Sequence, residues 1–285
     1  MEVVRPADAS EFLRLTVPML ERDEARNQLS LAVAGTVAEH PDAYDEARFW
    51  VVSDDDSPLA AALRTPPYGA ILPDPRSDAA LSAVLTAIAD DDPDIPGLVG
   101  NLPHVEEAAR VLAEATGRRH EAVLAQGVYA LRQVRSVRRA RGAARTATPG
   151  DRDLLRRWLT DFSTESLPDP GREIERIERN LDLRLGADDA GYWLWEDDDA
   201  PVSLSGFGGP TPSGIRIGPV YTPPEHRRRG YATSLVAEQS AWLLERGYRL
   251  CCLYTDLANP TSNRIYEEIG YERVAESRDY RFRER

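Results

Sequence analysis

An internal repeat is the feature of this sequence that most constrains its fold. The segment 49–58, FWVVSDDDSP, and the segment 192–201, YWLWEDDDAP, match at a constant offset. Each combines an aromatic and apolar strand, an acidic turn and the start of a second strand, which is the pattern of a β-hairpin. In both halves a short strand and amphipathic helical segments, beginning near Ala9 and Asp153, precede the hairpin. The repeat therefore predicts that the 285 residues form two related domains.

Downstream of its hairpin, each half alternates between strands and helices. Antiparallel strands followed by strand-helix-strand units predict an α+β fold, with a mixed, mostly antiparallel sheet flanked by helices in each domain. We place the domain boundary after residue 140, which gives domains 1–140 and 141–285. In the first half we expect strands at 68–72 and 95–100, helices at 78–89 and 105–116, and two strands within 120–134; in the second half we expect strands at 191–195, 202–207, 215–221, 249–254 and 276–283, with helices at 230–246 and 261–269.

The charge balance argues against nucleic acid as a partner. The chain has 48 acidic and 35 basic residues, a formal net charge of −13, and every basic residue is an arginine. A surface of this sign repels nucleic-acid phosphates and anionic membranes. The arginine-rich segment 132–145 is the exception, but no aromatic residues alternate with its arginines as stacking platforms. We therefore expect this segment to be a solvated linker and strand edge.

Several compositional features predict a cytoplasmic protein without a membrane or metal partner. No stretch reaches the roughly 20 apolar residues of a membrane helix, and the first residues lack the pattern of a secretory signal. The two cysteines, Cys251 and Cys252, are adjacent in an apolar run, which indicates packing in a reducing compartment. The four histidines stand apart from other candidate ligands, so we expect no metal site.

The segment 215–271 carries the chemistry. A strand at 215–221 leads into the run Arg-Arg-Arg-Gly-Tyr-Ala at 227–232, and a helix follows at once. A strand that turns through glycine into a helix presents unpaired backbone N–H groups, which bind phosphate oxygens together with the helix dipole. Gly230 and Ala232 are small where the backbone must approach an anion closely.

Two motifs in this segment resemble those of the GNAT superfamily of N-acetyltransferases. Arg227-x-x-Gly230-x-Ala232 is similar to the acyl-CoA pyrophosphate loop, Gln/Arg-x-x-Gly-x-Gly/Ala, and the segment 259–271 is similar to Asn-x-x-Ala/Ser-x-x-x-Tyr-x-x-x-Gly-Phe/Tyr. The resemblance covers residues 145–285 closely. In the first half the corresponding loop reads Pro-Asp-Pro-Arg at 73–76 and lacks glycine, so residues 1–140 resemble a degenerate GNAT-like copy that does not bind CoA.

The resemblance implies direct transfer of the acetyl group of acetyl-CoA, as cosubstrate, to a primary amine in a ternary complex. Tyr266 would be the acid that protonates the CoA thiolate, because a phenol of pKa about 10 is protonated at neutral pH. The N–H of Val220 would donate to the thioester oxygen. The implied cofactor-binding residues are Val220, Tyr221, Thr222, Arg227, Arg228, Arg229, Gly230, Tyr231, Ala232, Thr233, Asn259, Ser262 and Tyr266.

Several alternatives remain open at this point. Tyr266 also fits a core position on its helix, and Asn259 also fits a helix N-cap before Pro260. The general base is open between Asp256, His226, Glu165 and a water relay. A non-catalytic acyl-CoA sensor and an acyltransferase for longer acyl groups, as in the glycine acyltransferase-like branch, are rival functions. The acceptor is a small-molecule or peptide amine, and we expect the first domain to shape its cleft or to make an oligomer contact, as in a homodimer.

Overall fold

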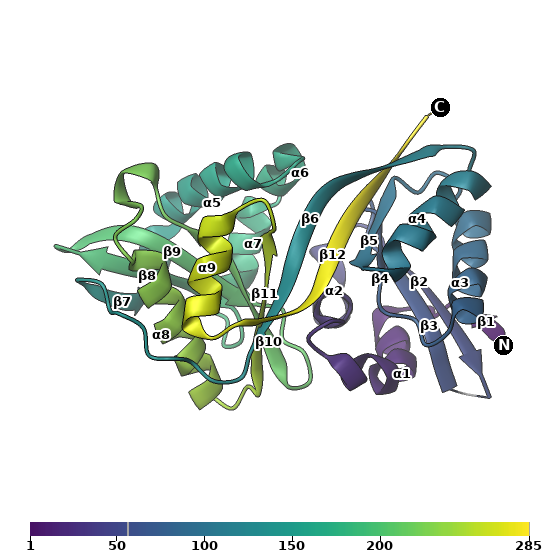
Figure 1. Ribbon diagram of the computed structural model, residues 1–285, viewed down its shortest axis with the longest axis horizontal. Helices are drawn as coiled ribbons and strands as arrows, with labels where there is room; N and C mark the ends of the chain where they lie inside the picture. The colour runs from purple at the N-terminus through teal and green to yellow at the C-terminus, as the bar shows by residue number, and fades with distance from the viewer. Residues whose placement is uncertain (56, 285) are drawn as a thin grey trace. The chain divides into compact units, whose positions relative to one another are not determined.

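The computed structural model describes residues 1–55 and 57–284 (Figure 1). Asp56, in the acidic turn of the first predicted hairpin, and Arg285, the last residue of the predicted second domain, lie outside the described residues. The chain divides into two compact units: unit 1 comprises Met1–Val128 and Val274–Arg285, and unit 2 comprises Tyr129–Arg273. The division therefore differs from a linear split after residue 140, because the last strand of the chain pairs within unit 1.

Unit 1 is a mixed sheet with two pairs of helices. The strand order is β1-β2-β3-β4-β5-β12-β6, in which β4 and β5 are parallel and β5 pairs antiparallel with β12. The elements are β1 (Glu2–Val4), α1 (Ala9–Leu20), η1 (Glu21–Asp23), α2 (Gln28–Glu39), η2 (Pro41–Ala43), β2 (Arg48–Asp54), β3 (Ser57–Arg64), β4 (Ala70–Leu72), α3 (Asp78–Asp91), β5 (Gly97–Asn101), α4 (His104–Ala115), β6 (Arg119–Leu131) and β12 (Glu272–Arg283).

The two faces of the unit 1 sheet bury separate cores. Along β2, Trp50 and Val52 belong to the core under α3 and α4, whereas Phe49 and Val51 belong to the core with α1 and α2. Successive side chains of a strand point to opposite faces, so this alternation fills both layers. Tyr280 and Phe282 of β12 and the apolar side of α4 complete the first core.

Unit 2 repeats this plan around a second mixed sheet. Its strand order runs from the end of β6 through β11-β10-β9-β8-β7, in which β10 and β11 are parallel. Figure 1 shows α8 and α9 side by side over one face of this sheet, and α5 and α7 pack on the opposite face. The elements are β7 (Ala143–Thr146), η3 (Pro149–Asp151), α5 (Arg152–Ser166), α6 (Pro170–Glu175), α7 (Ile177–Arg184), β8 (Gly191–Asp197), β9 (Ala200–Gly208), β10 (Gly214–Tyr221), η4 (Pro224–His226), α8 (Tyr231–Glu245), β11 (Leu250–Asp256) and α9 (Pro260–Ile269).

The sequence repeat corresponds to two hairpins with the same register. In β2–β3 a β-bulge lies between Val52 and Ser53, and in β8–β9 a bulge lies at the matching place before Glu196. Asp55 and Asp198, which match in the repeat, both have a positive φ, of 45° and 51°. Aspartate tolerates this conformation better than most residues, which explains the acidic turns.

One local expectation was wrong. The two strands expected within 120–134 are one long strand, β6, because the segment contains no turn signal strong enough to reverse the chain. The arginine-rich segment 132–145 is exposed along much of its length and ends in the edge strand β7, as expected of a solvated linker and strand edge. It also makes contacts along unit 2. Arg139 pairs with Glu238 of α8 at 2.7 Å, and the N–H of Ala140 donates to Ser234 Oγ at 2.8 Å. The segment therefore has much of its charge neutralised within the protein.

Candidate active site

The parallel strands of unit 2 stop pairing well before their carboxyl ends. In the described part of the chain, β10 and β11 pair only as far as Arg216 opposite Cys252, although β10 continues to Tyr221 and β11 to Asp256. In unit 1 the equivalent strands stay paired to the last residue of β4, where Leu72 lies opposite Gly100. A parallel pair that opens at its carboxyl end is a common place for ligands in α/β sheets.

A β-bulge lies where β10 leaves β11. The register between β9 and β10 shifts between Ile217 and Val220. Gly218 within this bulge has a φ of 139°, a conformation that glycine adopts without a steric penalty. A Cβ atom on Gly206 of β9 would lie 2.7 Å from the Gly218 oxygen, so the two backbones approach closely. Bulges of this kind re-aim a strand, and Val220 lies just past the bulge, in the part of β10 that does not pair with β11.

The connection from β10 to α8 ends in a row of backbone N–H groups without acceptors. Gly230 is the N-cap of α8 and has a left-handed φ of 82°, and Arg228 has a φ of 63°. The first hydrogen bond of the helix runs from the N–H of Ser234 to the Gly230 oxygen, at 3.0 Å. The N–H groups of residues 228–233 donate to no other described residue. Together with the positive end of the helix dipole, these donors fit the oxygens of a pyrophosphate.

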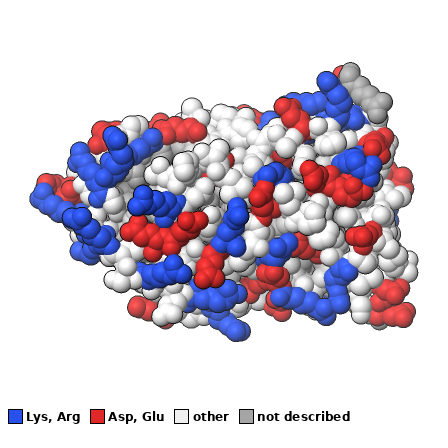
Figure 2. Space-filling view, viewed as in Figure 1, with Lys and Arg blue, Asp and Glu red and all other residues white. Residues whose placement is uncertain are grey.

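The arginines of this loop have different surroundings. The Arg227 guanidinium donates to the Thr222 oxygen at 2.8 Å and pairs with Glu165 at 2.6 Å. Arg229 donates to the Glu225 oxygen at 3.3 Å, and Arg228 contacts no polar partner among the described residues. Figure 2 shows basic side chains gathered over the β10–α8 loop. The loop therefore keeps positive charge available for an anionic ligand, although Arg227 is turned toward α5.

Tyr266 is a buried phenol whose hydroxyl is not committed. It lies on α9 with 8% of its surface exposed, and burial raises its pKa above the ordinary value. Tyr266 and Val220 pack on the same apolar cluster, between the sheet and α8 and α9. Its hydroxyl bonds no other described residue, whereas the hydroxyls of Tyr221, Tyr231 and Tyr271 bond Glu165, Asp197 and Ser240, respectively. A protonated phenol without a partner can donate to a ligand atom.

A known family matches this same region of the chain. Residues 152–271 match the profile of the Acetyltransferase (GNAT) family. This chain carries a GNAT acetyltransferase domain. The matched segment includes α5, the opened strands, the N–H-rich loop and α9, so it contains the whole candidate site. No curated protein matches the sequence of the chain.

Solved structures extend the GNAT fold to the whole chain. A tandem GNAT protein from the clavulanic acid biosynthesis pathway is 16% identical, with a TM-score of 0.60 over 98% of each chain. A GCN5-related N-acetyltransferase from Sphaerobacter thermophilus is 20% identical, with a TM-score of 0.59 over 98% of this chain and 95% of that one. A Drosophila protein is 12% identical, with a TM-score of 0.67 over 99% of this chain and 98% of that one. The fold is therefore two GNAT-like domains in tandem, as the repeat predicted.

Asn259 of the GNAT domain serves as a helix cap. Its Oδ1 accepts the N–H of Ser262 at 3.1 Å at the start of α9, which is the ordinary N-cap bond. This bond uses the Asn259 oxygen and the Ser262 N–H. The Asn259 amide N–H donors and the Ser262 hydroxyl are what remain for a ligand, so the predicted cofactor role of both residues stays a prediction.

Tyr221, the last residue of β10, and Thr222, which follows it, both have side chains that bond other residues of the GNAT domain. Tyr221 donates to Glu165 at 3.1 Å, and the Thr222 hydroxyl lies 2.8 Å from the Ser203 hydroxyl. Burial, followed by the hydrogen bond to Glu165, raises the pKa of Tyr221 to about 12. The sequence carried no signal for the Tyr221–Glu165 contact or for Ser203, because these residues meet only through the fold. The predicted cofactor contact of Tyr221 and the predicted main-chain contact of Thr222 with the cofactor stay predictions.

The three candidates for a general base differ in their hydrogen bonds and in their positions in the fold. Asp256 accepts the N–H of Ala258 at 2.8 Å, which is the role of an aspartate in a turn. His226 lies in η4, where its Nδ1 is buried without a hydrogen-bond partner. Glu165 is the carboxylate that the fold brings to the end of β10.

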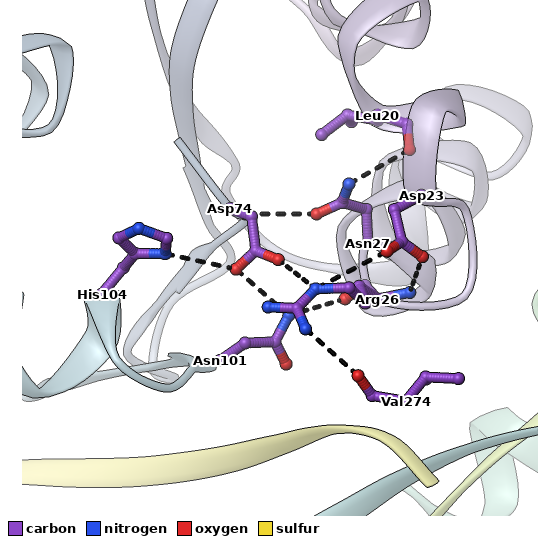
Figure 3. Close-up of polar contacts among 8 residues, drawn as sticks. All are labelled: Leu20, Asp23, Arg26, Asn27, Asp74, Asn101, His104 and Val274. Atoms are coloured by element: carbon purple, nitrogen blue, oxygen red, sulfur yellow. Dashed lines mark hydrogen bonds and ion pairs between the residues drawn. The ribbon is translucent and has the colours of Figure 1, made fainter. Parts of the chain in front are cut away.

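The corresponding place in unit 1 is filled by the protein itself (Figure 3). Asp74, which follows β4, pairs with Arg26 Nε at 2.5 Å, and its N–H donates to Asn27 Oδ1 at 3.2 Å. Arg26 also donates to the Val274 oxygen at 3.1 Å, and Asn101 at the end of β5 donates to the Arg26 oxygen at 3.0 Å. An aspartate in this position repels phosphate and consumes the nearby donors.

The described residues contain neither a metal-binding cluster nor a membrane-spanning helix. Within 1–55 and 57–284, no group of three or more His, Cys, Asp or Glu side chains is arranged to hold a metal ion. Nor does any helix in these segments have the length and hydropathy required to cross a membrane.

Proposed function

We propose that unit 2 is an N-acetyltransferase that transfers the acetyl group of acetyl-CoA directly to a primary amine in a ternary complex. The observation that carries this proposal is the phenol of Tyr266, which bonds no other described residue and lies in the same apolar cluster as Val220 of β10. A purely structural tyrosine in a buried position usually bonds a neighbour, as the other three tyrosines around the site do. The acceptor is a small-molecule or peptide amine.

Different residues of unit 2 bind the cofactor and stabilise the charge that develops in the reaction. The free N–H groups of residues 228–233 hold the pyrophosphate. The backbone at Val220 of β10 and at Thr222 just after it, which does not pair with β11, holds the pantetheine arm as an added strand would. The N–H of Val220 donates to the thioester oxygen, where negative charge develops as the amine attacks. Acetyl-CoA supplies an activated acyl group.

The proton balance assigns one transfer to Tyr266. The neutral amine attacks the carbonyl carbon, so that an N–C bond forms and the C–S bond breaks. Tyr266 donates its proton to the departing sulfur, and the acylated nitrogen releases a proton to solvent, from which the phenol is protonated again. Burial favours the neutral form of Tyr266, which is the form that can donate.

We propose that unit 1, the degenerate GNAT-like copy predicted at 1–140, does not bind CoA, whereas the copy predicted at 141–285 does. Asp74 and its ion pair with Arg26 support this assignment. Cys251 and Cys252 are buried as thiols rather than joined in a disulfide, which supports a cytoplasmic location.

Thermal unfolding with acetyl-CoA tests the binding step. A ligand at about 100 times its Kd stabilises the folded state by about 2.7 kcal/mol, which raises the Tm by a few degrees. We expect this rise in the wild type and its loss in Gly230→Glu, which places a carboxylate among the free N–H groups. Gly247→Glu is the matched control, since Gly247 follows α8, has a φ of 105° and has open space around it. It carries the same backbone strain but should keep the rise.

Turnover separates the proposal from its rivals. With a panel of amines and thiol detection, the wild type should release CoA in proportion to acylated amine. Stabilisation by acetyl-CoA without turnover on any amine would identify a sensor instead. Faster turnover with longer acyl-CoAs would identify a different acyl donor. No stabilisation at saturating acetyl-CoA would overturn the proposal entirely.

A further inference from the structure

We propose that Tyr221 binds the acceptor amine as a hydrogen-bond acceptor, and that Glu165 is the positioning residue that commits Tyr221 to this role. The inference rests on the proposed function, because it describes how the second substrate is held in the same site. The acceptor is then an amine whose N–H groups can donate and which has no carboxylate next to its amino group.

Tyr221 lies on the opposite face of β10 from the group that would serve the thiolate. Val220 packs on the cluster under α8 and α9, which also contains Tyr266, whereas Tyr221 packs in the cluster under α5 and α7. Neighbouring residues of a strand face opposite sides of the sheet. The end of β10 that does not pair with β11 therefore has one phenol on each of its faces. This arrangement allows the two substrates to meet at Val220 from opposite sides.

The position of the Tyr221 ring is fixed by its surroundings. Only 6% of the residue is exposed. Its ring packs on that of Trp158 of α5, with 6.4 Å between centroids, and the Arg227 guanidinium lies 5.8 Å from the centroid of the Tyr221 ring. A ring held between an indole and a guanidinium keeps its hydroxyl in one place, so the direction of the hydroxyl hydrogen decides what it can bind.

The hydrogen bonds of Glu165 fix the direction of the Tyr221 hydroxyl hydrogen. Glu165 Oε1 accepts a hydrogen bond from the Tyr221 hydroxyl at 3.1 Å, and Glu165 Oε2 accepts one from Arg227 Nη2 at 2.6 Å. A carboxylate can only accept, so the one proton of the phenol points toward Glu165. What remains on the Tyr221 oxygen is acceptor capacity. Only a donor, such as an amine or ammonium N–H, can bind there. Tyr266 is the opposite case, because its hydroxyl proton bonds no described residue and can be donated to a ligand.

The local charge favours a cationic acceptor. Arg227 offsets the charge of Glu165, but Asp161, one helical turn earlier on α5, has no ion-pair partner among the described residues. The Asp161 charge acts on Tyr221, where it adds to the causes that raise the pKa of the phenol. A site with an uncompensated carboxylate attracts an ammonium and repels an amine that carries its own carboxylate.

Steady-state kinetics with acetyl-CoA and n-butylamine, benzylamine, a lysine-containing peptide and glycine test this inference. We expect the first three amines to be used and glycine to be used poorly. In Tyr221→Phe and Glu165→Ala the KM for the amine should rise about tenfold, the effect of one lost hydrogen bond, while the KM for acetyl-CoA stays within about twofold. Glu165→Gln should recover part of the loss, because its amide oxygen still accepts the phenol proton.

A double variant distinguishes positioning from direct binding. If Glu165 acts through Tyr221, adding Glu165→Ala to Tyr221→Phe raises the amine KM no further. The inference would be overturned if the rise in amine KM in the double variant equalled the product of the rises in the two single variants, or if Tyr221→Phe left the amine KM unchanged. In either case, turnover by the wild type would still support the proposed function. No turnover on any amine would overturn both. Glu178→Ala is the matched control, since Glu178 also pairs with arginines of α5, Arg152 and Arg156, and should keep wild-type kinetics.

Discussion

At the scale of single residues, the site is defined by which polar atoms have partners. Tyr221 and Tyr266 are both buried, and burial raises the pKa of each phenol, yet their protons are assigned differently. Tyr221 donates to Glu165, and Tyr266 donates to no described residue. The same residue type can therefore serve as an acceptor on one face of β10 and as a proton donor on the other.

Replacing Tyr266 with phenylalanine should separate chemistry from binding. We expect kcat to fall about 100-fold, because a positioned acid contributes about this much, while the KM for acetyl-CoA changes little. Since the pKa of Tyr266 is raised, the phenol stays protonated at all pH values below its ordinary titration range, and the wild-type kcat should show no loss from this group up to about pH 10. Wild-type kcat in Tyr266→Phe would show that the phenol is only a core residue.

At the scale of elements, the start of the first helices of unit 2 depends on a capping box tied to the sheet. Thr148 and Asp151 bond each other's backbone at η3, with the N–H of Thr148 donating to Asp151 at 2.8 Å. Arg145 of β7 donates to the other oxygen of Asp151 at 2.8 Å and also bonds Glu196 of β8. The cap therefore fixes where α5 leaves the sheet, and α5 carries Glu165.

The pH dependence of stability should reveal this cap. The hydrogen bond from Arg145 lowers the pKa of Asp151 to about 2. A lowered pKa means that the ionised carboxylate stabilises the fold above about pH 4 and that this contribution is lost as the pH falls toward 2. Asp151→Asn should thus cost about 1 kcal/mol in urea unfolding at pH 7, and the difference from the wild type should shrink below about pH 4.

Asp153→Asn provides the comparison for this measurement. Asp153 is in the first turn of α5, but its side chain is 88% exposed, so its replacement should change the unfolding free energy by less than about 0.5 kcal/mol. An Asp151→Asn deficit that persists unchanged down to pH 3 would contradict the assigned ionisation.

At the scale of the whole molecule, unit 1 is completed by the last strand of the chain. β12 pairs with β5 from Ser277 to Arg281, and a Cβ atom on Gly97 of β5 would lie 2.0 Å from the Tyr280 oxygen. The Ser277 hydroxyl bonds the Gly100 oxygen at 3.0 Å in a buried position. Unit 1 therefore cannot complete its core until all of unit 2 has been synthesised.

Removing a core side chain from β12 should destabilise unit 1. Phe282 is 7% exposed in the core under α3 and α4, so Phe282→Ala should cost about 3 kcal/mol in chemical unfolding. The exposed neighbour Arg283 is the control, and Arg283→Ala should change stability by less than about 0.5 kcal/mol. Equal stability of the two variants would mean that β12 is not needed for the core of unit 1.

The sequence by itself determined the features that depend on neighbouring residues. The duplicated hairpins, the positive-φ aspartates of their turns and the N–H-rich loop ending at Gly230 all follow from local backbone preferences, so they could be predicted. The N-cap role of Asn259, kept open from the sequence, is local in the same way.

Only the tertiary structure decided which distant segments meet. It placed β12 in unit 1, joined β6 into one strand, ended the β10–β11 pairing at Arg216 and brought Glu165 to Tyr221 across 56 residues. Strand partners and side-chain contacts of this kind depend on burial and hydrogen bonding summed over the whole core. No short stretch of sequence contains that information, because the local pattern of a strand is compatible with pairing to any of several other strands.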